Sequence, residues 1–206
     1  MEGRFNTCIY LKLDQNDKLI LFKNLQTKIL ELKNKILTKE KQIKLGYDQL
    51  IPIEKLHISF VSNIGLSYYQ KIIITKELKE ILKNKLEGLL ISDLTNFIFL
   101  KDKSTRFLCF EVLDINNWWK EIYDDLKLYL LNNGFSKNLF FDSPICHISI
   151  FKTEKILKKK PIQIILKRSV EDLFMCKNIK NVKISFDKII LKIGNEENYI
   201  NLIKQY

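Results

Sequence analysis

Residues 56–61 read LHISFV and residues 146–151 read CHISIF, so the tripeptide His-Ile-Ser occurs twice in the chain. Its two histidines, His57 and His147, are the only histidines in the sequence. Ser makes up 10 of the 206 residues, so a Ser two places after both histidines would arise by chance in roughly one of 400 sequences of this composition. The repeated tripeptide is therefore the first guide to both the fold and a candidate site.

Each tripeptide lies in a short apolar run that is too short for a stable helix and rich in branched residues. The first run is bounded by Pro52 and Gly65, and the second is preceded by Pro144. Both runs are predicted to be strands. Side chains two apart in a strand point to the same face, so each imidazole is expected beside the hydroxyl of its own tripeptide. Two such strands could face one another across a groove.

The rest of the chain alternates between strand-like and helix-like periodicity. A strand is predicted over 5–13, where the alternation is loose at the start but Ile9, Leu11 and Leu13 recur at every second position. Two hairpins are expected, one joining 97–100 to 107–113 through the polar residues 101–104, and one joining 182–193 to 199–203 around Gly194. Helices are predicted from residue 16 to before Gly46, over 68–90, over 118–131 with Gly134 after it, and over 161–175.

This order of elements repeats coarsely, because a strand, a helix, a His strand and a helix occur in each half of the chain. The prediction is an α+β fold with two pseudo-symmetric lobes of antiparallel sheet, flanked by helices, with the active-site groove between the lobes. The length suits one two-lobed domain over residues 1–206.

Composition narrows the class of protein. Hydrophobic residues make up 46% and charged residues 29%, which is typical of a folded globular chain. No apolar run approaches the ~18 residues of a membrane-spanning helix, and the first residues lack the apolar stretch of a signal peptide, so no membrane partner is expected. The four cysteines form no C-x-x-C pair and are expected to be reduced, as in an intracellular protein. The net charge of +11 favours polyanionic partners, which include RNA, DNA and an anionic membrane surface.

Paired imidazoles suit phosphodiester transesterification in RNA. One neutral imidazole takes the proton of a ribose 2′-hydroxyl, which attacks the adjacent phosphorus, while the other, protonated, imidazole protonates the departing 5′-oxygen. An unperturbed pKa of ~6.5 makes both forms accessible near neutral pH. Ser59 and Ser149 would donate to the non-bridging phosphate oxygens. This chemistry requires neither metal nor cofactor, and two histidines fall short of the three protein ligands typical of catalytic zinc.

The segments around the tripeptides carry a family resemblance that spans nearly the whole chain. Paired His-x-Ser or His-x-Thr tripeptides are similar to those of the two-histidine phosphoesterase superfamily. The surrounding sequence resembles the branch of this superfamily that trims the 3′ oligouridine tail of U6 snRNA. The segments concerned are 54–59 (EKLHIS), 105–112 (TRFLCFEV), 141–149 (FDSPICHIS) and 192–195 (KIGN).

The resemblance implies a monomeric, metal-independent nuclear enzyme. Such an enzyme removes 3′-terminal nucleotides, chiefly uridines, as a 3′-to-5′ exoribonuclease and leaves a 2′,3′-cyclic phosphate, which some members then open. Phe141, six residues before His147, corresponds to the position of an aromatic side chain that stacks on the terminal base. Tyr68, eleven residues past His57, is a second candidate substrate contact. Both aromatic residues could instead serve packing.

Alternative readings stay open at this point. Another enzyme of the same superfamily would act as a 2′,3′-cyclic nucleotide phosphodiesterase on other RNA ends. A basic RNA-binding module without catalysis would explain the charge but would not depend on the histidines. Within the first reading, His57 and His147 could exchange the roles of acid and base.

Overall fold

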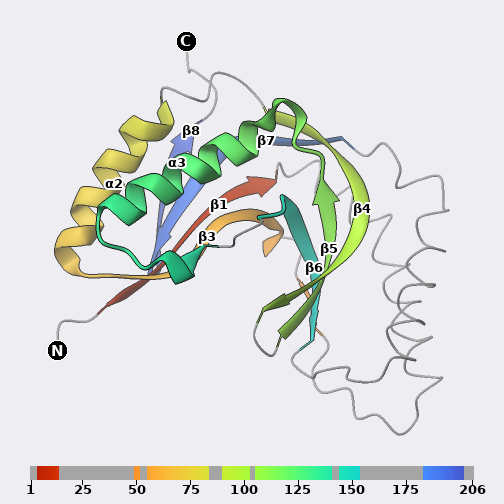
Figure 1. Cartoon of the computed structure of the whole chain (residues 1–206), viewed down its shortest axis with the longest axis horizontal. Helices are drawn as coiled ribbons and strands as arrows, with labels where there is room; N and C mark the ends of the chain where they lie inside the picture. The colour runs from red at the N-terminus through yellow and green to blue at the C-terminus, as the bar shows by residue number, and fades with distance from the viewer. Residues whose placement is uncertain are drawn as a thin grey trace, which may run out of the picture.

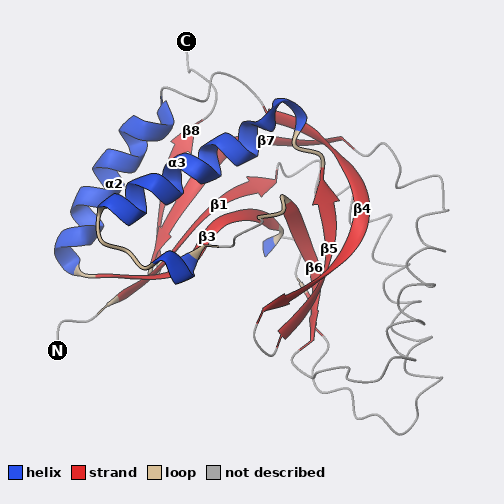
Figure 2. Ribbon diagram, in the orientation of Figure 1, coloured by secondary structure: helices blue, strands red, loops and turns tan. Residues whose placement is uncertain are grey.

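The computed structural model describes residues 4–13, 49–51, 55–83, 90–102, 105–140, 144–153 and 183–201. Within these ranges the chain forms one antiparallel sheet and two α-helices (Figure 1, Figure 2). The predicted α+β class is confirmed. The elements are β1 (Phe5–Leu13), β2 (Gln49–Leu50), β3 (His57–Leu66), α2 (Tyr68–Lys83), β4 (Leu90–Asp102), β5 (Thr105–Val112), the 3-10 turn η2 (Ile115–Asn117), α3 (Trp118–Asn132), the 3-10 turn η3 (Lys137–Leu139), β6 (His147–Thr153), β7 (Lys183–Ile193) and β8 (Glu196–Asn201).

The sheet has two halves. Strands β8, β7, β1 and β3 are neighbours in that order and form one half, while β6, β5 and β4 form the other, with β2 beside β6. The halves meet where β3 pairs with β6 and where β4 pairs with the first residues of β7. Figure 1 shows α2 and α3 lying over the half that contains β1, β3, β7 and β8. The two expected lobes are therefore two halves of one continuous sheet.

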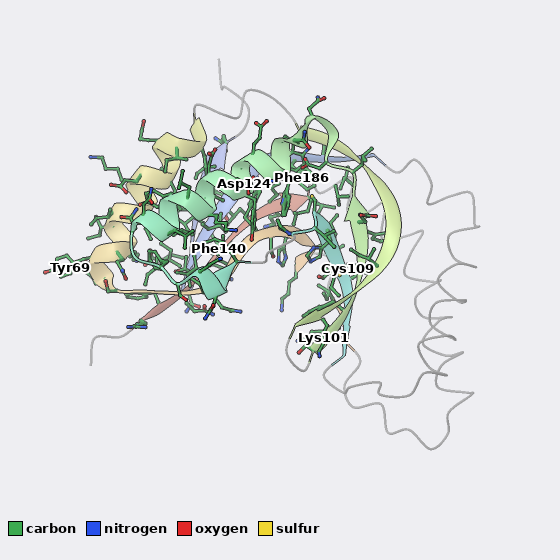
Figure 3. All side chains as sticks on the ribbon, in the orientation of Figure 1. Tyr69, Lys101, Cys109, Asp124, Phe140 and Phe186 are labelled. Atoms are coloured by element: carbon green, nitrogen blue, oxygen red, sulfur yellow. The ribbon has the colours of Figure 1, made fainter. Side chains whose placement is uncertain are left out.

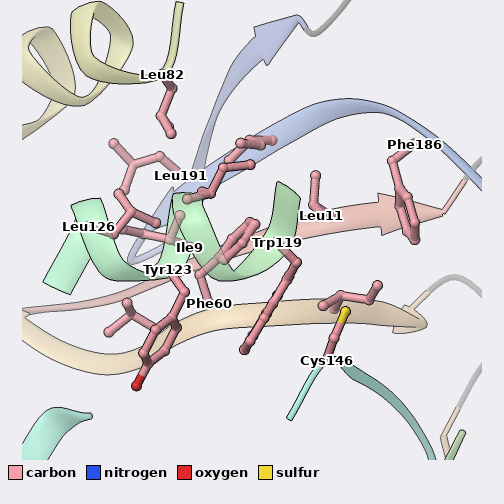
Figure 4. Close-up of a cluster of buried hydrophobic side chains, with 14 of the residues drawn as sticks. Ile9, Leu11, Phe60, Leu82, Trp119, Tyr123, Leu126, Cys146, Phe186 and Leu191 are labelled. Carbon is pink, nitrogen blue, oxygen red and sulfur yellow. The ribbon is translucent and has the colours of Figure 1, made fainter. Parts of the chain in front are cut away.

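The main part of the hydrophobic core lies between the first half of the sheet and the two helices (Figure 4), and the core continues onto buried residues of β5 and β6. In β1, Ile9, Leu11 and Leu13 are buried while the residues between them are partly exposed, which is the predicted two-residue alternation. Helix α2 contributes buried residues at four-residue spacing, and α3 contributes a stripe of three- and four-residue spacing, so each presents one apolar face to the sheet. These helix residues are Ile74, Leu78, Leu82, Trp119, Ile122, Tyr123, Leu126 and Leu130.

Helix α2 begins where a reciprocal pair of hydrogen bonds satisfies its first backbone groups. The amide of Gln70 donates to Oγ of Ser67 at 3.4 Å, and the amide of Ser67 donates to Oε1 of Gln70 at 2.9 Å. This is the capping box expected of a Ser-x-x-Gln sequence. The predicted helix over 68–90 ran too far, because Leu90 is the first residue of β4 and pairs with Phe186 of β7.

Helix α3 has a side-chain cap at its start and a glycine after its end. The carboxylate of Asp114 accepts from the amides of Trp119 at 2.8 Å and Lys120 at 3.1 Å, and its negative charge suits the positive end of the helix dipole. Gly134 has a φ of 78° and its amide donates to the carbonyl of Leu131. This left-handed residue ends the helix as the sequence predicts.

Both predicted hairpins are confirmed, although β4, β5 and β8 each begin before the apolar run that predicted them. The β4–β5 pairing continues to Asp102 opposite Thr105, and β7 pairs with β8 around Gly194, whose φ is 59°. Strand β3 likewise passes Gly65, which was expected to bound it, and ends at Leu66. The two-residue strand β2 was not predicted, because two residues carry no periodicity. The helices predicted from residue 16 and over 161–175 lie outside the described residues.

Two further features bear on the sequence predictions. None of the described helices has the length and apolar content needed to cross a membrane. Cys8, Cys109 and Cys146 are free thiols.

Candidate active site

One register pair between the two halves of the sheet creates the site. Ile58 of β3 lies opposite Ile148 of β6, and both side chains are fully buried in the core. The residues on either side of an isoleucine in a strand point to the opposite face of the sheet. The histidine before each isoleucine and the serine after it therefore point away from the core, on one shared face.

The antiparallel direction of the pair crosses the two tripeptides. Stepping along β3 and β6 in opposite directions places His57 opposite Ser149, and Ser59 opposite His147. The two imidazoles are diagonal neighbours, for which a separation of about 7–8 Å between backbone positions is usual. The structure therefore brings together the four polar residues that the sequence singled out, in an arrangement with local twofold symmetry. A phosphate group could sit between the imidazoles.

Each imidazole is hydrogen-bonded to the backbone carbonyl two residues before it in the chain. Nδ1 of His57 donates to the carbonyl of Lys55 at 2.5 Å, and Nδ1 of His147 donates to the carbonyl of Ile145 at 2.6 Å. Because a carbonyl can only accept, Nδ1 carries the hydrogen, and in the neutral ring the lone pair is on Nε2. Sequence reasoning missed these contacts, since a backbone carbonyl is not encoded by residue type.

Burial affects the protonation of His147. Desolvation lowers the pKa of this imidazole below its ordinary value of 6.5, and the hydrogen bond to the carbonyl of Ile145 opposes that shift only in part. The neutral form is therefore populated to a lower pH than in an exposed histidine. A neutral imidazole is the form that can accept a proton.

Strand β5 supplies the neighbours of the β6 tripeptide. Cys109 lies opposite Ser149 and Glu111 lies opposite His147. The Sγ of Cys109 is 3.4 Å from the Oγ of Ser149. Burial raises the pKa of the Cys109 thiol to about 12, so it stays protonated at neutral pH. Figure 3 labels this residue on β5, within the segment 105–112 that contributed to the family resemblance.

Strand β1 supplies the neighbours of the β3 tripeptide, and sequence reasoning missed them. Lys12 lies opposite His57, and Tyr10 lies opposite Ser59. The ring centroid of Tyr10 is 4.9 Å from that of His57, at an interplanar angle of 54°. The Oη of Tyr10 donates to Glu197 of β8 at 3.2 Å, and burial together with the Glu197 charge raises the pKa of this phenol. The two-residue period of β1 points Tyr10 and Lys12 away from the core, but only the strand order shows which residues they meet.

Of the two aromatic candidates, the one that the structure describes, Tyr68, is not brought to this cluster. Tyr68 is 60% exposed on the first turn of α2, beyond the end of β3 that is remote from His57. At about 3.3 Å per residue, the length of β3 separates them by roughly 30 Å. Phe141 lies outside the described residues. Its neighbour Phe140 packs against the core, with its ring edge-on to Tyr123.

Among the described residues, no group of three or more His, Cys, Asp or Glu side chains is placed to hold a metal ion. Among the described residues, the hydrogen-bond donors beside the histidines are the hydroxyls of Ser59 and Ser149, the thiol of Cys109 and the amine of Lys12. This donor set suits the binding and protonation of an anionic substrate.

The comparison with families settles the affiliation of the chain. A family model described as "HVSL: Uncharacterised conserved protein" matches residues 1–201. The chain belongs to the HVSL family. No curated protein sequence matches it significantly.

Solved structures share the fold over nearly the whole chain. Usb1 of Kluyveromyces marxianus is 12% identical, with 97% of this chain and 98% of that chain covered and a TM-score of 0.57. A Thermus thermophilus protein, TT0787, is 8% identical, with 95% and 97% covered and a TM-score of 0.55. LigT of E. coli in complex with 3'-AMP is 10% identical, with 97% and 95% covered and a TM-score of 0.52.

These structures show that the chain shares their fold, which agrees with the fold that the sequence resemblance implies.

Proposed function

We propose that the protein is a 3′-to-5′ RNA exonuclease that trims uridine-rich 3′ ends by 2′-hydroxyl transesterification. The observation that carries this proposal is the Ile58–Ile148 pair, which sets two imidazoles and two hydroxyls on one face of the sheet. Acid–base catalysis by two imidazoles on opposite sides of a phosphate is the chemistry that this geometry suits best.

The reaction divides the proton transfers between the imidazoles. One neutral imidazole removes the proton of the 2′-hydroxyl of the penultimate ribose through its Nε2. The hydroxyl oxygen then bonds to phosphorus, and the bond from phosphorus to the 5′-oxygen of the terminal nucleoside breaks. The other, protonated, imidazole donates its proton to that oxygen. The products are a shortened RNA with a 2′,3′-cyclic phosphate and a released terminal nucleoside.

His147 is the better candidate for the base. Its buried position favours the neutral form, as its lowered pKa indicates. By elimination, His57 then serves as the acid. The two serines donate to the non-bridging phosphate oxygens, where negative charge grows in the transition state.

The substrate proposed is the 3′ end of U6 snRNA in the nucleus, bound by the monomeric chain. Relatives in fold support a nucleotide ligand, since Kluyveromyces marxianus Usb1 has been solved with uridine monophosphate and E. coli LigT with 3'-AMP. The net charge of +11 supports a polyanionic ligand.

The test is incubation with a 5′-labelled RNA ending in several uridines, in excess EDTA, with products resolved over time on a denaturing gel. The expected result is a ladder that shortens from the 3′ end, with cyclic phosphate at the new ends. Replacing His57 or His147 by Ala should remove activity while the circular dichroism spectrum is kept. Intact RNA, or an unimpaired double variant, would contradict the proposal.

Substrate choice is tested in the same assay. RNAs that end in uridines, adenosines or an existing 2′,3′-cyclic phosphate are compared at equal length. Ring opening without loss of nucleotides would instead support a cyclic phosphodiesterase.

A further inference from the structure

The face of the sheet that carries the histidines continues beyond them, across β1 and β7, to the edge strand β8. Ser59 is opposite Tyr10, Tyr10 is opposite Ile190 of β7, and Ile190 is opposite Tyr199 of β8. Cross-strand partners share a face, so this row runs from the catalytic tripeptide to Tyr199. At about 4.8 Å between strands, Ser59 and Tyr199 are roughly 14 Å apart. A few nucleotides of an extended strand can cover that distance.

The end of this row on β7 and β8 carries an exposed aromatic ring with basic neighbours. Tyr199 is 50% exposed, and Nζ of Lys188 lies 5.7 Å from its ring centroid. The side chain of Lys192 is 44% exposed and its Nζ lies 3.8 Å from Glu197. We call Lys188, Lys192, Glu197 and Tyr199 the β8-side strip. Lys12, next to His57, extends its positive charge toward the histidines.

The carboxylate of Glu197 organises the strip. It accepts from Oη of Tyr199 at 2.8 Å and from Oη of Tyr10 at 3.2 Å, so it fixes both phenols. These hydrogen bonds, with the nearby charges of Lys12 and Lys192, lower the pKa of Glu197. The hydrogen bond to Glu197 thus fixes the hydroxyl end of Tyr199, while the side chain stays 50% exposed.

We propose that the β8-side strip binds the RNA chain on the 5′ side of the scissile phosphate, with a base stacked on Tyr199 and phosphates beside Lys188 and Lys192. This inference rests on the proposed exonuclease function. An exonuclease holds the terminal nucleotide at its site, so only the 5′ side of the RNA is long enough to extend along a strip of this length. Aromatic rings interleaved with lysines are what single-stranded nucleic acid requires, because the rings stack on bases and the amines pair with phosphates.

The experiment measures binding apart from cleavage. The probes are a ten-nucleotide and a two-nucleotide oligouridylate, each with a 2′-deoxy penultimate ribose, which cannot form a cyclic phosphate. Dissociation constants are measured by fluorescence anisotropy or calorimetry. The wild-type protein should bind the longer RNA more tightly. Tyr199→Ala should weaken binding of the longer RNA by about five-fold to about a hundred-fold. It should therefore remove most of the difference in affinity between the longer and the shorter RNA.

The residues chosen for matched control substitutions lie on α2, on the other side of the sheet. Tyr69 is 72% exposed, so Tyr69→Ala removes a tyrosine that is more accessible than Tyr199 and should leave both dissociation constants as they are. For the longer RNA, the log of the association constant falls linearly with the log of the salt concentration. Lys192→Gln should make this slope shallower by about 0.7 per lost phosphate contact. Lys79→Gln, at an exposed position of α2, should not reduce it.

The outcomes separate this inference from the proposed function. The RNA-binding role of the β8-side strip would be wrong if the wild-type protein bound both RNA lengths with equal affinity. It would also be wrong if Tyr199→Ala and Tyr69→Ala lost equal affinity for the longer RNA. Either result would count even if cleavable RNA is trimmed. A gain from length that depends on Tyr199 would support the strip. If such a gain is found while cleavable RNA stays intact, the strip stands as an RNA-binding site and the exonuclease proposal fails.

Discussion

The Sγ of Cys109 on β5 lies 3.4 Å from the Oγ of Ser149 on β6, directly across the strand pair. The thiol is buried and its pKa is raised to about 12, so it remains a neutral hydrogen-bonding group at any pH at which RNA cleavage would be studied. The hydroxyl that we assign to the phosphate therefore has a fixed neighbour. In this way β5, which contributes no histidine, positions the hydroxyl of Ser149.

Replacing Cys109 by Ala should lower kcat more than it changes KM. The variant loses one weak hydrogen bond to Ser149, for which a cost of about 0.5–1.5 kcal/mol, or roughly two- to ten-fold in kcat, is usual. Single-turnover cleavage of a uridine-ended RNA measures the effect. Cys109→Ser keeps a hydrogen-bonding group at this place and should recover much of the rate. If Ala and Ser variants have the same rate, the Cys109–Ser149 contact has no part in catalysis.

The stability of the protein should fall in acid, partly through His147. Its folded-state pKa is lowered from 6.5 by burial, so the unfolded chain binds a proton more readily than the folded protein does. The stabilising effect of the neutral ring is complete above about pH 6.5 and is lost as the pH falls toward the lower, folded-state pKa. Urea unfolding of wild type and His147→Gln over this range measures it. The variant, which cannot titrate at this position, should lose less stability on acidification, and parallel curves would contradict the assignment.

The packing of Tyr10 on the His57 ring should matter more for activity than the phenol hydroxyl does. Tyr10→Phe keeps the ring and removes the hydrogen bond to Glu197, at a cost of about 0.5–1.5 kcal/mol in the free energy of unfolding. Tyr10→Ala also removes the ring that confines the imidazole, and should lower kcat by about 10- to 100-fold. Steady-state cleavage rates and urea unfolding of both variants decide this. A Phe variant as inactive as the Ala variant would assign the effect to the hydroxyl instead.

The interface between α3 and the sheet should dominate the stability of this half of the fold. Leu126 is fully buried, and Leu126→Ala should cost about 2–5 kcal/mol in the free energy of unfolding, because it leaves a cavity between helix and sheet. Leu128, two residues further along the same helix, is 60% exposed and provides the control. Leu128→Ala should change stability by less than about 0.5 kcal/mol. Chemical unfolding curves measure both, and similar losses would show that α3 is not packed as described.

Local sequence patterns determined much of the secondary structure. The two-residue alternation of 5–13, the Ser-x-x-Gln pair at 67–70 and Gly134 after α3 each act within a few residues of the chain, so the backbone follows them directly. The repeated His-Ile-Ser also determined the chemistry, because imidazole and hydroxyl groups two residues apart in a strand must share a face. The class of enzyme that we propose follows from that local pattern.

The tertiary structure alone decided how these groups meet. The register of Ile58 opposite Ile148 crosses the tripeptides, so that each histidine faces the serine of the other. Cys109 and Tyr10 come from strands that are distant in sequence, and nothing in their own neighbourhoods shows which residues they contact. Tyr68 shows that closeness in sequence does not ensure contact. It is eleven residues from His57, but most of the intervening residues form the extended strand β3, which separates the two side chains. Strand order and register depend on the burial of the whole core rather than on any one segment, and for that reason they could not be predicted from local sequence patterns alone.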